Sequence, residues 1–211
     1  MRGLKAGGDL ELLEAWRGGD QEAGATLYQR YFSLVRNLVR GKTTDEEDVL
    51  QRVFESLVRV RNKLEVHTSF RAYLVAITRN ELVRSLRERA RDPHAFDPST
   101  ISADSVVPSP SEAVAWRAEQ RALLSALVRI PLDSQIIVEL HYWESMSTAE
   151  LGEAFGVPRS TIKTRIQRAR QQLQEQLRTL AIDPEVVERT TQNLERWARS
   201  IRQQADWELD R

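Results

Sequence analysis

The stretch STAELGEAFGVPRSTIKTRIQRARQQL, from Ser147 to Leu173, predicts two helices joined by a tight turn. Ser147 and Glu150 have the spacing of a capping box, which marks the start of the first helix. Gly156 can adopt the positive φ angle that ends this helix, and Pro158 suits the start of a second one. The pattern is typical of a helix-turn-helix whose second helix lies against DNA.

The predicted second helix has one apolar stripe and basic side chains on its other faces. The stripe repeats every three or four positions, as a buried face does: Ile162, Ile166, Ala169, Leu173 and Leu177. The basic residues are Arg159, Lys163, Arg165, Arg168 and Arg170. The whole chain carries 31 basic and 31 acidic residues and has no net charge. The positive field of this helix is therefore local, which suits binding in a DNA groove.

Composition excludes several classes of protein. The chain has no cysteine, which excludes disulfides, thiolate zinc sites and cysteine nucleophiles, and its three histidines have no metal-ligand spacing. Glycine-rich phosphate loops and nucleophile elbows are absent, as are a signal peptide and an apolar run long enough to span a membrane. We therefore expect a cytoplasmic protein that is not an enzyme, has no cofactor or metal, and does not insert into membranes.

Helical periodicity dominates the chain, so we expect an all-α fold with two helical domains. The first domain covers residues 9–90, and Asp9 is expected to cap its first helix. Its helices are predicted at 9–16, 21–39, 44–61 and 69–90. Residues 91–111 contain four of the seven prolines and predict a flexible linker. The second domain, which contains the helix-turn-helix, covers residues 112–179.

Residues 180–211 predict a C-terminal helical extension. Asp183 and Pro184 suit a helix start, and an apolar side follows with Leu194 and Trp197. Such a helix is marginal alone in water, so its apolar side needs a packing partner. One interpretation is permanent packing on the second domain. The alternative is a regulatory latch that holds the two domains together, and of the two we favour packing.

The first domain carries a second pattern, DEEDVLQRVFESLV, from Asp45 to Val58. One side of this predicted helix is apolar and expected to be buried: Val49, Leu50, Val53, Phe54, Leu57 and Val58. The opposite side carries polar residues: Asp48, Gln51, Arg52 and Glu55. Taken alone, this polar side is equally compatible with a solvated surface and with a protein interface.

Together these patterns resemble the extracytoplasmic-function (ECF) group of bacterial sigma factors. The resemblance rests on Asp45–Val58, on the segment FRAYLVAITRNELVRSLRERAR that follows it, and on the helix-turn-helix. It covers about Asp9 to Ala90 and Glu112 to Leu177. It implies core RNA polymerase and promoter DNA as partners, with an anti-sigma factor as a further one.

The resemblance also implies roles for individual residues. It places core-polymerase contacts at Asp48, Gln51 and Glu55. It assigns binding of the −10 promoter element to His67, Tyr73, Arg79, Asn80, Arg84 and Arg87. It assigns binding of the −35 element to Arg159, Ser160, Lys163, Thr164, Arg165 and Arg168. For Phe70, Leu74 and Ile77 we favour plain core packing, whereas Tyr73 is equally suited to packing and to DNA contact.

Two other functions compete with this interpretation. A stand-alone helix-turn-helix regulator would bind DNA without polymerase, and would need neither the acidic helix nor the segment around Asn80. A sigma-mimicking adaptor would bind an anti-sigma factor in place of DNA, which favours a degraded basic helix. The sequence has the acidic helix and an intact basic helix, so we expect a sigma factor that directs transcription initiation.

Overall fold

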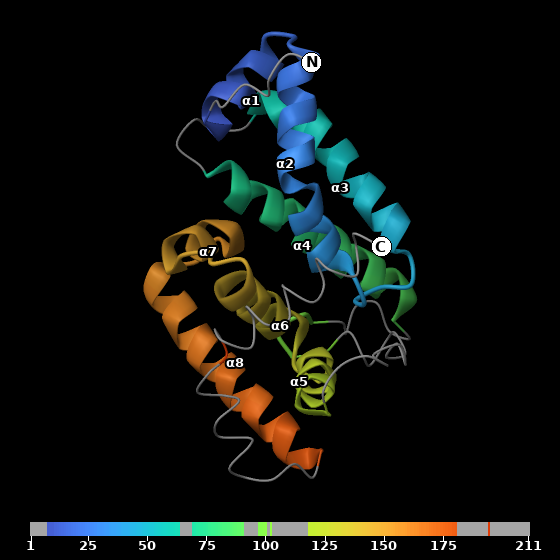
Figure 1. The fold of residues 1–211 in the computed structure, drawn as a ribbon, viewed down its shortest axis with the longest axis vertical. Coiled ribbons are helices and arrows are strands. Elements are labelled where there is room, and N and C mark those ends of the chain that lie inside the picture. The colour runs from blue at the N-terminus through green and yellow to red at the C-terminus, as the bar shows by residue number, and fades with distance from the viewer. Residues whose placement is uncertain are drawn as a thin grey trace.

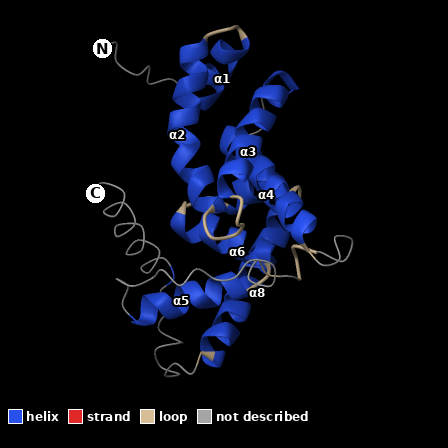
Figure 2. Cartoon of the chain, turned by 90° about the vertical axis from the view of Figure 1, so that its right-hand side faces the viewer, coloured by secondary structure: helices blue, strands red, loops and turns tan. Residues whose placement is uncertain are grey.

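The structure is a computed structural model that describes residues 8–63, 69–90, 97–100, 102, 118–180 and 194. Within these residues every regular element is a helix, and Figures 1 and 2 show how the helices are arranged. The prediction of an all-α fold is confirmed over this part of the chain.

We call residues 8–90 the N-terminal region and residues 118–180 the C-terminal region. The N-terminal region contains α1 (Asp9–Arg17), α2 (Gln21–Val39), α3 (Glu46–Val60), the short 3₁₀ turn η1 (Arg61–Lys63) and α4 (Phe70–Arg89). The C-terminal region contains α5 (Ala118–Arg129), α6 (Leu132–Val138), the π-helical turn η3 (Glu139–Trp143), α7 (Thr148–Phe155) and α8 (Arg159–Thr179). The predicted C-terminal helix starting at Asp183 lies outside the described residues, except for Leu194.

Side-chain caps set the starts of two long helices. The Asp20 carboxylate accepts hydrogen bonds from the backbone N–H groups of Glu22 and Ala23, and so caps α2. The Ser69 hydroxyl accepts a hydrogen bond from the Ala72 N–H and caps α4. Such caps satisfy N–H groups that have no partner within the helix. Both helices therefore begin within one residue of the predicted positions.

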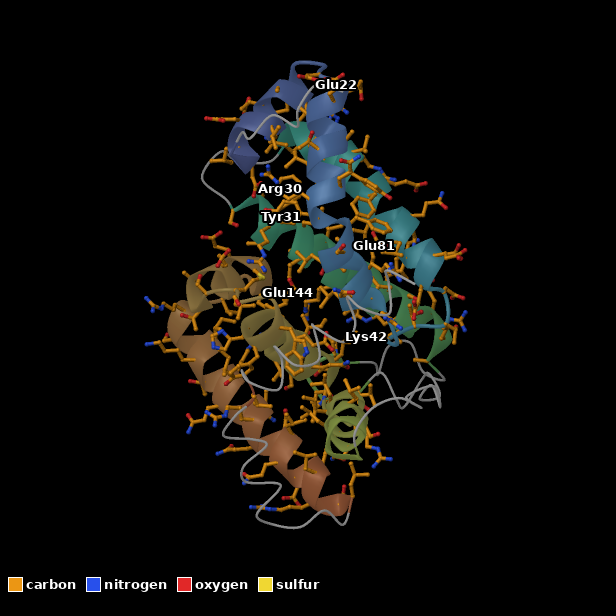
Figure 3. All side chains as sticks on the ribbon, in the orientation of Figure 1. Glu22, Arg30, Tyr31, Lys42, Glu81 and Glu144 are labelled. Carbon is orange, nitrogen blue, oxygen red and sulfur yellow. The ribbon has the colours of Figure 1, made fainter. Side chains whose placement is uncertain are left out.

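The predicted role of Asp9 as a cap is wrong. Gly8 occupies the cap position of α1, and Asp9 is the first residue inside the helix. The Asp9 carboxylate contacts α2, where it accepts hydrogen bonds from Arg30 and from the Tyr31 hydroxyl. Figure 3 labels both of these α2 residues. Asp9 therefore ties α1 to α2, a long-range contact that local capping rules do not predict.

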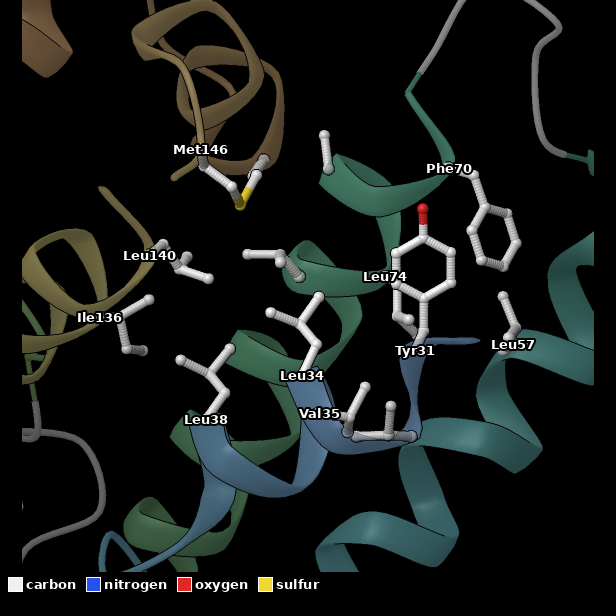
Figure 4. Close-up of a cluster of buried hydrophobic side chains, with 14 of the residues drawn as sticks. Tyr31, Leu34, Val35, Leu38, Leu57, Phe70, Leu74, Ile136, Leu140 and Met146 are labelled. Atoms are coloured by element: carbon white, nitrogen blue, oxygen red, sulfur yellow. The ribbon is translucent and has the colours of Figure 1, made fainter. Parts of the chain in front are cut away.

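The two regions share one hydrophobic core. Leu34 and Leu38 from α2 and Leu74 from α4 belong to the same buried cluster as Ile136 and Leu140 from the C-terminal region. Figure 4 shows these side chains facing one another across the boundary. Helical periodicity predicts which face of each helix is buried, but not which helix covers it. The sequence therefore predicted two helical domains without predicting that they pack together.

A second cluster lies in the C-terminal region and also contains Leu194. Leu194 is 1% exposed and belongs to the same cluster as Leu127 of α5, Val138 of α6 and Leu173 of α8. Burial of a leucine side chain stabilises a fold by about 1.5–3 kcal/mol relative to exposure. The position of Leu194 supports the packing interpretation of the extension at this residue.

Among the described residues, no helix has both the length and the apolar character needed to cross a membrane. The longest helix, α8, carries charged or polar side chains on most of its surface. The first half of α8 belongs to the helix-turn-helix, and its second half packs in the second cluster.

Candidate nucleic-acid and protein interfaces

Helices α7 and α8 form the predicted helix-turn-helix. The Ser147 hydroxyl accepts from the Glu150 N–H at 3.2 Å, and the Glu150 carboxylate accepts from the Ser147 N–H at 2.9 Å. Gly156 ends α7 with a φ of 63°, and Pro158 is the cap residue of α8. The predicted apolar stripe of α8 is buried throughout. The capping box, the turn and the stripe are therefore all confirmed.

Gly152 has a structural role that the sequence analysis missed. It lies buried in α7, and its carbonyl accepts a hydrogen bond from the Val157 N–H at 2.9 Å. A Cβ atom added to Gly152 would lie 2.9 Å from the carbonyl oxygen of Val157. A backbone oxygen in a tight turn cannot move aside as a flexible side chain can. A glycine inside a helical pattern is the sequence signal that points to such a close approach.

We predict that Gly152→Ala destabilises the protein. Helix propensity alone would make alanine about 1 kcal/mol more stable than glycine in a helix. Overpacking against the Val157 carbonyl costs about 1–3 kcal/mol, so the net effect is expected to be a loss of stability. Each kcal/mol corresponds to roughly 2–4 °C in the melting temperature of a protein of this size. Thermal unfolding followed by circular dichroism measures the shift.

The exposed residue Ala149, in the same helix, offers a control for this substitution. Ala149→Gly introduces no clash, so only propensity acts, and we expect a loss of about 1 kcal/mol. The two substitutions are the reverse of each other, yet both should lower the melting temperature. An increase in the melting temperature for Gly152→Ala would contradict the close approach at the turn.

The basic face of α8 is open to solvent over its first half. Arg159, Ser160, Lys163, Thr164 and Arg168 are exposed. Arg159 is oriented by α7, because its Nε donates to the Thr148 hydroxyl at 2.8 Å. Arg165 differs from the others, since it is half-buried and its guanidinium lies 6.0 Å from the centre of the Phe155 ring. The predicted −35 residues therefore share one helix, and all but Arg165 are exposed to solvent.

The predicted −10 residues other than His67 lie on α4, in differing environments. Asn80, Arg84 and Arg87 are exposed, and Arg84 forms an ion pair with Glu88 at 3.0 Å. Tyr73 is half-buried and packs against the shared core, which fits the packing role as well as the DNA role. His67 lies outside the described residues. As expected, Phe70 and Leu74 are buried, and Ile77 packs against the same core.

Three of the four predicted polar residues of the acidic helix α3 lie together on its solvent-exposed side. Asp48, Gln51 and Glu55 are exposed, and the Gln51 side-chain amide donates to the Glu55 carboxylate at 2.8 Å. Arg52 is less exposed than expected, because it points toward Glu81 of α4 at 3.6 Å. The three residues therefore form one solvent-facing acidic and polar strip on the N-terminal region.

An apolar groove runs beside this strip, and the sequence analysis missed it. The groove has a volume of about 690 Å³ and is lined by Tyr28, Phe32, Glu47, Leu50, Gln51, Phe54, Glu55, Val58 and Arg59. The predicted burial of Val58 is wrong, since it is 51% exposed. No helix among the described residues covers this side of α2 and α3, so Leu50 and Phe54 are only half-buried. Exposed apolar side chains gathered beside polar ones are typical of protein interfaces.

Polar contacts join the two regions beside the shared core. Lys42 is 1% exposed, and its Nζ lies 2.7 Å from Glu139 Oε2. Arg71 of α4 forms an ion pair with Glu144 at 3.7 Å, and also donates to the Glu144 carbonyl. Figure 3 shows Lys42 and Glu144 where the regions meet. Removing one partner of a buried pair leaves an uncompensated charge, so these contacts favour one relative placement of the regions.

Arg79 also joins α4 to the C-terminal region, through a pair of hydrogen bonds. Its Nε and Nη2 donate to the two carboxylate oxygens of Asp133, at 2.6 and 2.8 Å. Nearer the start of α4, the Ser69 N–H donates to the Glu153 carboxylate at 3.1 Å. In this arrangement the side chain of Arg79, which was predicted to contact DNA, is engaged inside the protein.

Among the described residues, no group of three or more His, Asp or Glu side chains is placed to hold a metal ion. Burial and the hydrogen bond to Asp9 raise the pKa of Tyr31, and burial raises the pKa of Tyr73. Both tyrosine hydroxyls therefore stay neutral at physiological pH and act as packing or hydrogen-bonding groups.

Two family models match the chain in the order of its two regions. Residues 27–92 match Sigma-70 region 2, and residues 120–173 match Sigma-70, region 4. The first match covers most of α2 and all of α3 and α4. The second covers most of α5, all of α6 and α7, and most of α8. The matches thus contain the exposed strip on α3 and the helix-turn-helix.

Curated relatives extend the similarity over most of the chain. The ECF RNA polymerase sigma factor SigW of Bacillus subtilis is 27% identical over 176 residues, covering 77% of this chain and 92% of its own length. The RNA polymerase sigma factor CarQ of Myxococcus xanthus is 29% identical over 175 residues, covering 81% and 98%. The similarity therefore spans both regions of each protein.

Solved structures share the fold. CnrH in complex with the cytosolic domain of CnrY aligns with a TM-score of 0.59 at 21% identity, covering 81% of this chain and 97% of that one. The sigma factor RpoE in complex with the anti-sigma factor NepR from Bartonella quintana aligns with a TM-score of 0.52 at 21% identity, covering 73% and 96%. At this identity the likeness concerns the fold alone.

Proposed function

Because this chain belongs to the ECF group of bacterial RNA polymerase sigma factors, we propose that α3 binds core polymerase while α4 and α8 bind the −10 and −35 promoter elements. As a sigma factor, the protein binds core RNA polymerase and directs promoter recognition and transcription initiation. The observation that carries the assignment of surfaces is the separate exposure of an acidic strip on α3 and a basic face on α8.

The surface proposed for core polymerase combines the acidic strip with the apolar groove. Asp48 and Glu55 offer carboxylates to basic side chains of a partner, and Gln51 offers an amide beside them. The rings of Tyr28 and Phe54, 4.5 Å apart, offer apolar area in the adjacent groove. An apolar centre beside polar groups is the usual composition of a specific interface. We propose that both parts contact polymerase together.

The surface proposed for the −10 element is the exposed side of α4. Asn80 can form hydrogen bonds with base edges, while Arg84 and Arg87 can bind phosphates. Opening the duplex and extracting a base costs a few kcal/mol, which contacts to the unpaired strand must offset. The predicted contribution of His67 to this site remains a prediction. No bond is made or broken in this role, so we propose that the protein works by binding alone.

The surface proposed for the −35 element is the first half of α8. Arg159, Ser160, Lys163 and Thr164 lie near the start of the helix, where side chains of a recognition helix reach base edges in the major groove. Arg168 lies farther along and suits a phosphate contact, and the same role was predicted for Arg165. Because the apolar stripe of α8 is buried, the side of the helix that carries these polar and basic residues faces solvent.

We also propose an anti-sigma factor as a partner and the cytoplasm as the site of action. The structural neighbour CnrH is seen in complex with the cytosolic domain of CnrY, and RpoE is seen in complex with the anti-sigma factor NepR. The present chain shares their fold over 73% or more of its length. Promoter DNA and RNA polymerase are cytoplasmic in bacteria, which is where a sigma factor meets them.

Binding measurements with purified core polymerase and duplex DNA test the proposed division of surfaces. We expect the chain to co-elute with core polymerase, and to bind promoter-containing duplex tightly only in that complex. A stand-alone regulator would bind its DNA equally well without polymerase. A sigma-mimicking adaptor would not bind DNA even when polymerase is present, so either result would reject the proposal.

Removing the C-terminal extension distinguishes its two interpretations. We predict that a chain ending before Asp183 has a lower melting temperature, because the removed segment includes Leu194, which is buried among α5, α6 and α8. Promoter-dependent transcription should not increase. A truncated chain with an unchanged melting temperature and higher activity would instead establish the latch.

A further inference from the structure

Arg159, the first residue of α8, is hydrogen-bonded to the first residue of α7. Its Nε donates to the Thr148 hydroxyl at 2.8 Å, although the two residues are 11 positions apart in the sequence. Arg159 is exposed, whereas Thr148 is half-buried. Within the part of the chain that the structure describes, Arg159 forms no ion pair. The orientation of its guanidinium therefore depends on the hydroxyl of Thr148.

The backbone around Thr148 is fixed by hydrogen bonds on both sides of it. Ser147 and Glu150 exchange the two hydrogen bonds of the capping box, at 3.2 and 2.9 Å. The Val157 N–H donates to the Gly152 carbonyl at 2.9 Å, and this bond holds the turn between the two helices. The side chain of threonine is branched at Cβ, which restricts its χ1 angle. The acceptor for Arg159 is thus presented from a well-defined position.

The contact with Thr148 determines which donors of Arg159 remain for a ligand. A guanidinium carries one N–H on Nε and four on Nη1 and Nη2, and has no acceptor. In the major groove guanine offers two acceptors, O6 and N7. Adenine and cytosine each place a donor there, and thymine offers the single acceptor O4. An arginine that is held at Nε and binds through its two terminal nitrogens therefore favours guanine.

We propose that Thr148 is a positioning residue for promoter recognition, which holds Arg159 so that Nη1 and Nη2 bind O6 and N7 of one guanine in the −35 element. The contact with guanine rests on the proposed function of α8, whereas the contact between Thr148 and Arg159 does not. Fixing a long side chain before binding reduces the conformational entropy that is lost on binding. The effect is specific for one base position, because only Arg159 is held in this way by Thr148.

Two other roles for Thr148 make different predictions. The first helix of a helix-turn-helix crosses the DNA backbone, so the Thr148 hydroxyl could bind a phosphate directly. Loss of a phosphate contact weakens binding to all sequences alike and reduces the salt dependence. A purely structural role lowers the melting temperature and weakens readout along the whole of α8. The positioning role alone predicts weaker preference at a single base position.

Sequencing of bound DNA measures the base preference at every position of the −35 element. The probe is a promoter fragment that the wild-type complex of full-length protein and core polymerase retains, with its −35 base pairs randomised. We expect Arg159→Ala to reduce the preference for guanine at one position by roughly 5- to 150-fold, the discrimination of one bidentate pair. Thr148→Val keeps the shape of the side chain without its hydroxyl. It should reduce the same preference by about two- to tenfold, the usual effect of one lost hydrogen bond.

Further variants isolate the contact between Thr148 and Arg159. Thr148→Ser keeps the hydroxyl and should retain the preference for guanine. The double variant Thr148→Val, Arg159→Ala should be no less selective than Arg159→Ala alone, because both changes remove the same contact. Thr179→Val is the matched control, since it removes a threonine hydroxyl that donates to the Gln176 carbonyl at the far end of α8. This control should leave the preference unchanged. Thermal unfolding verifies that each variant is folded.

Several results would overturn the positioning role. One is an unchanged preference for guanine in Thr148→Val while Arg159→Ala relaxes it. Another is equal weakening of all sequences by Thr148→Val, with a salt slope reduced by about one unit, which would establish a phosphate contact. A position that is relaxed by Arg159→Ala but prefers a base other than guanine would overturn the proposed base. If Arg159→Ala relaxed no position, the proposed −35 role of Arg159 would fail as well.

Nuclear magnetic resonance of the free full-length protein tests the contact without DNA or polymerase. The Nε–H signal of Arg159 is identified by its absence from the Arg159→Ala spectrum. We expect this proton to exchange with water several-fold more slowly in the wild-type chain and in Thr148→Ser than in Thr148→Val. Equal exchange rates in the wild-type chain and Thr148→Val would overturn the contact itself. Because this measurement needs no promoter, it separates failure of the positioning role from failure of the proposed function.

Discussion

A chain carrying both Asp48→Arg and Gln51→Ala will bind core RNA polymerase roughly 100-fold more weakly or worse. Like charges brought together at an interface cost several kcal/mol, and about 1.4 kcal/mol corresponds to a tenfold change in affinity. Both side chains are exposed on α3, and the hydrogen bond lost between Gln51 and Glu55 is worth only about 0.2–0.5 kcal/mol to the helix. The fold should therefore be preserved, which circular dichroism can verify.

A charge reversal elsewhere controls for the general effect of added positive charge. Glu175→Arg lies on the exposed side of α8, outside the strip on α3, and disturbs only a surface ion pair with Arg178. Surface pairs of this kind contribute about 0–1 kcal/mol. Biolayer interferometry with immobilised core polymerase should show unchanged binding for this variant. Equal weakening by both substitutions would mean that α3 is not the polymerase-binding surface.

The second prediction concerns the recognition helix. Arg159→Ala combined with Lys163→Ala should weaken binding of the reconstituted polymerase complex to the −35 element by about 2–6 kcal/mol, because each lost base contact is worth about 1–3 kcal/mol. Preference among bases should relax at the contacted positions. Arg159 also donates to Thr148, so thermal unfolding must show that α7 and α8 stay folded.

Arg168→Ala provides the matched comparison on the same helix. A phosphate contact carries no base information, so affinity should fall alike for all sequences. The slope of log affinity against log salt should also decrease by about one unit. Fluorescence anisotropy over a salt series and a set of −35 substitutions measures both quantities. A changed base preference with an unaltered salt slope would show that the roles of Lys163 and Arg168 are assigned wrongly.

Local patterns predicted the parts of this structure that depend on local interactions. The capping box at Ser147, the glycine turn at Gly156 and the buried stripe of α8 all follow from residues within a few positions of one another. The exposure of Asp48, Gln51 and Glu55 follows from the helical period of α3. The two family models match residues 27–92 and 120–173, one in each region.

The features that sequence reasoning missed depend on contacts between distant residues. Val58 has the period of a buried residue, but no helix among the described residues covers that side of α2 and α3. Asp9 looks like a cap and instead binds Arg30 and Tyr31 of α2. Arg79 has the position of a DNA contact and instead binds Asp133, which is 54 residues away. Periodicity identifies the face that is buried or exposed, but not the partner that meets it.

Run-off transcription with purified core polymerase tests the central claim most directly. Templates drawn from the genome of the source bacterium would be transcribed by core polymerase with and without the full-length protein. We expect discrete transcripts only when the protein is present, and their loss with the Asp48→Arg, Gln51→Ala variant but not with Glu175→Arg. A transcript pattern that is the same with and without the protein would contradict its assignment as a promoter-specificity subunit.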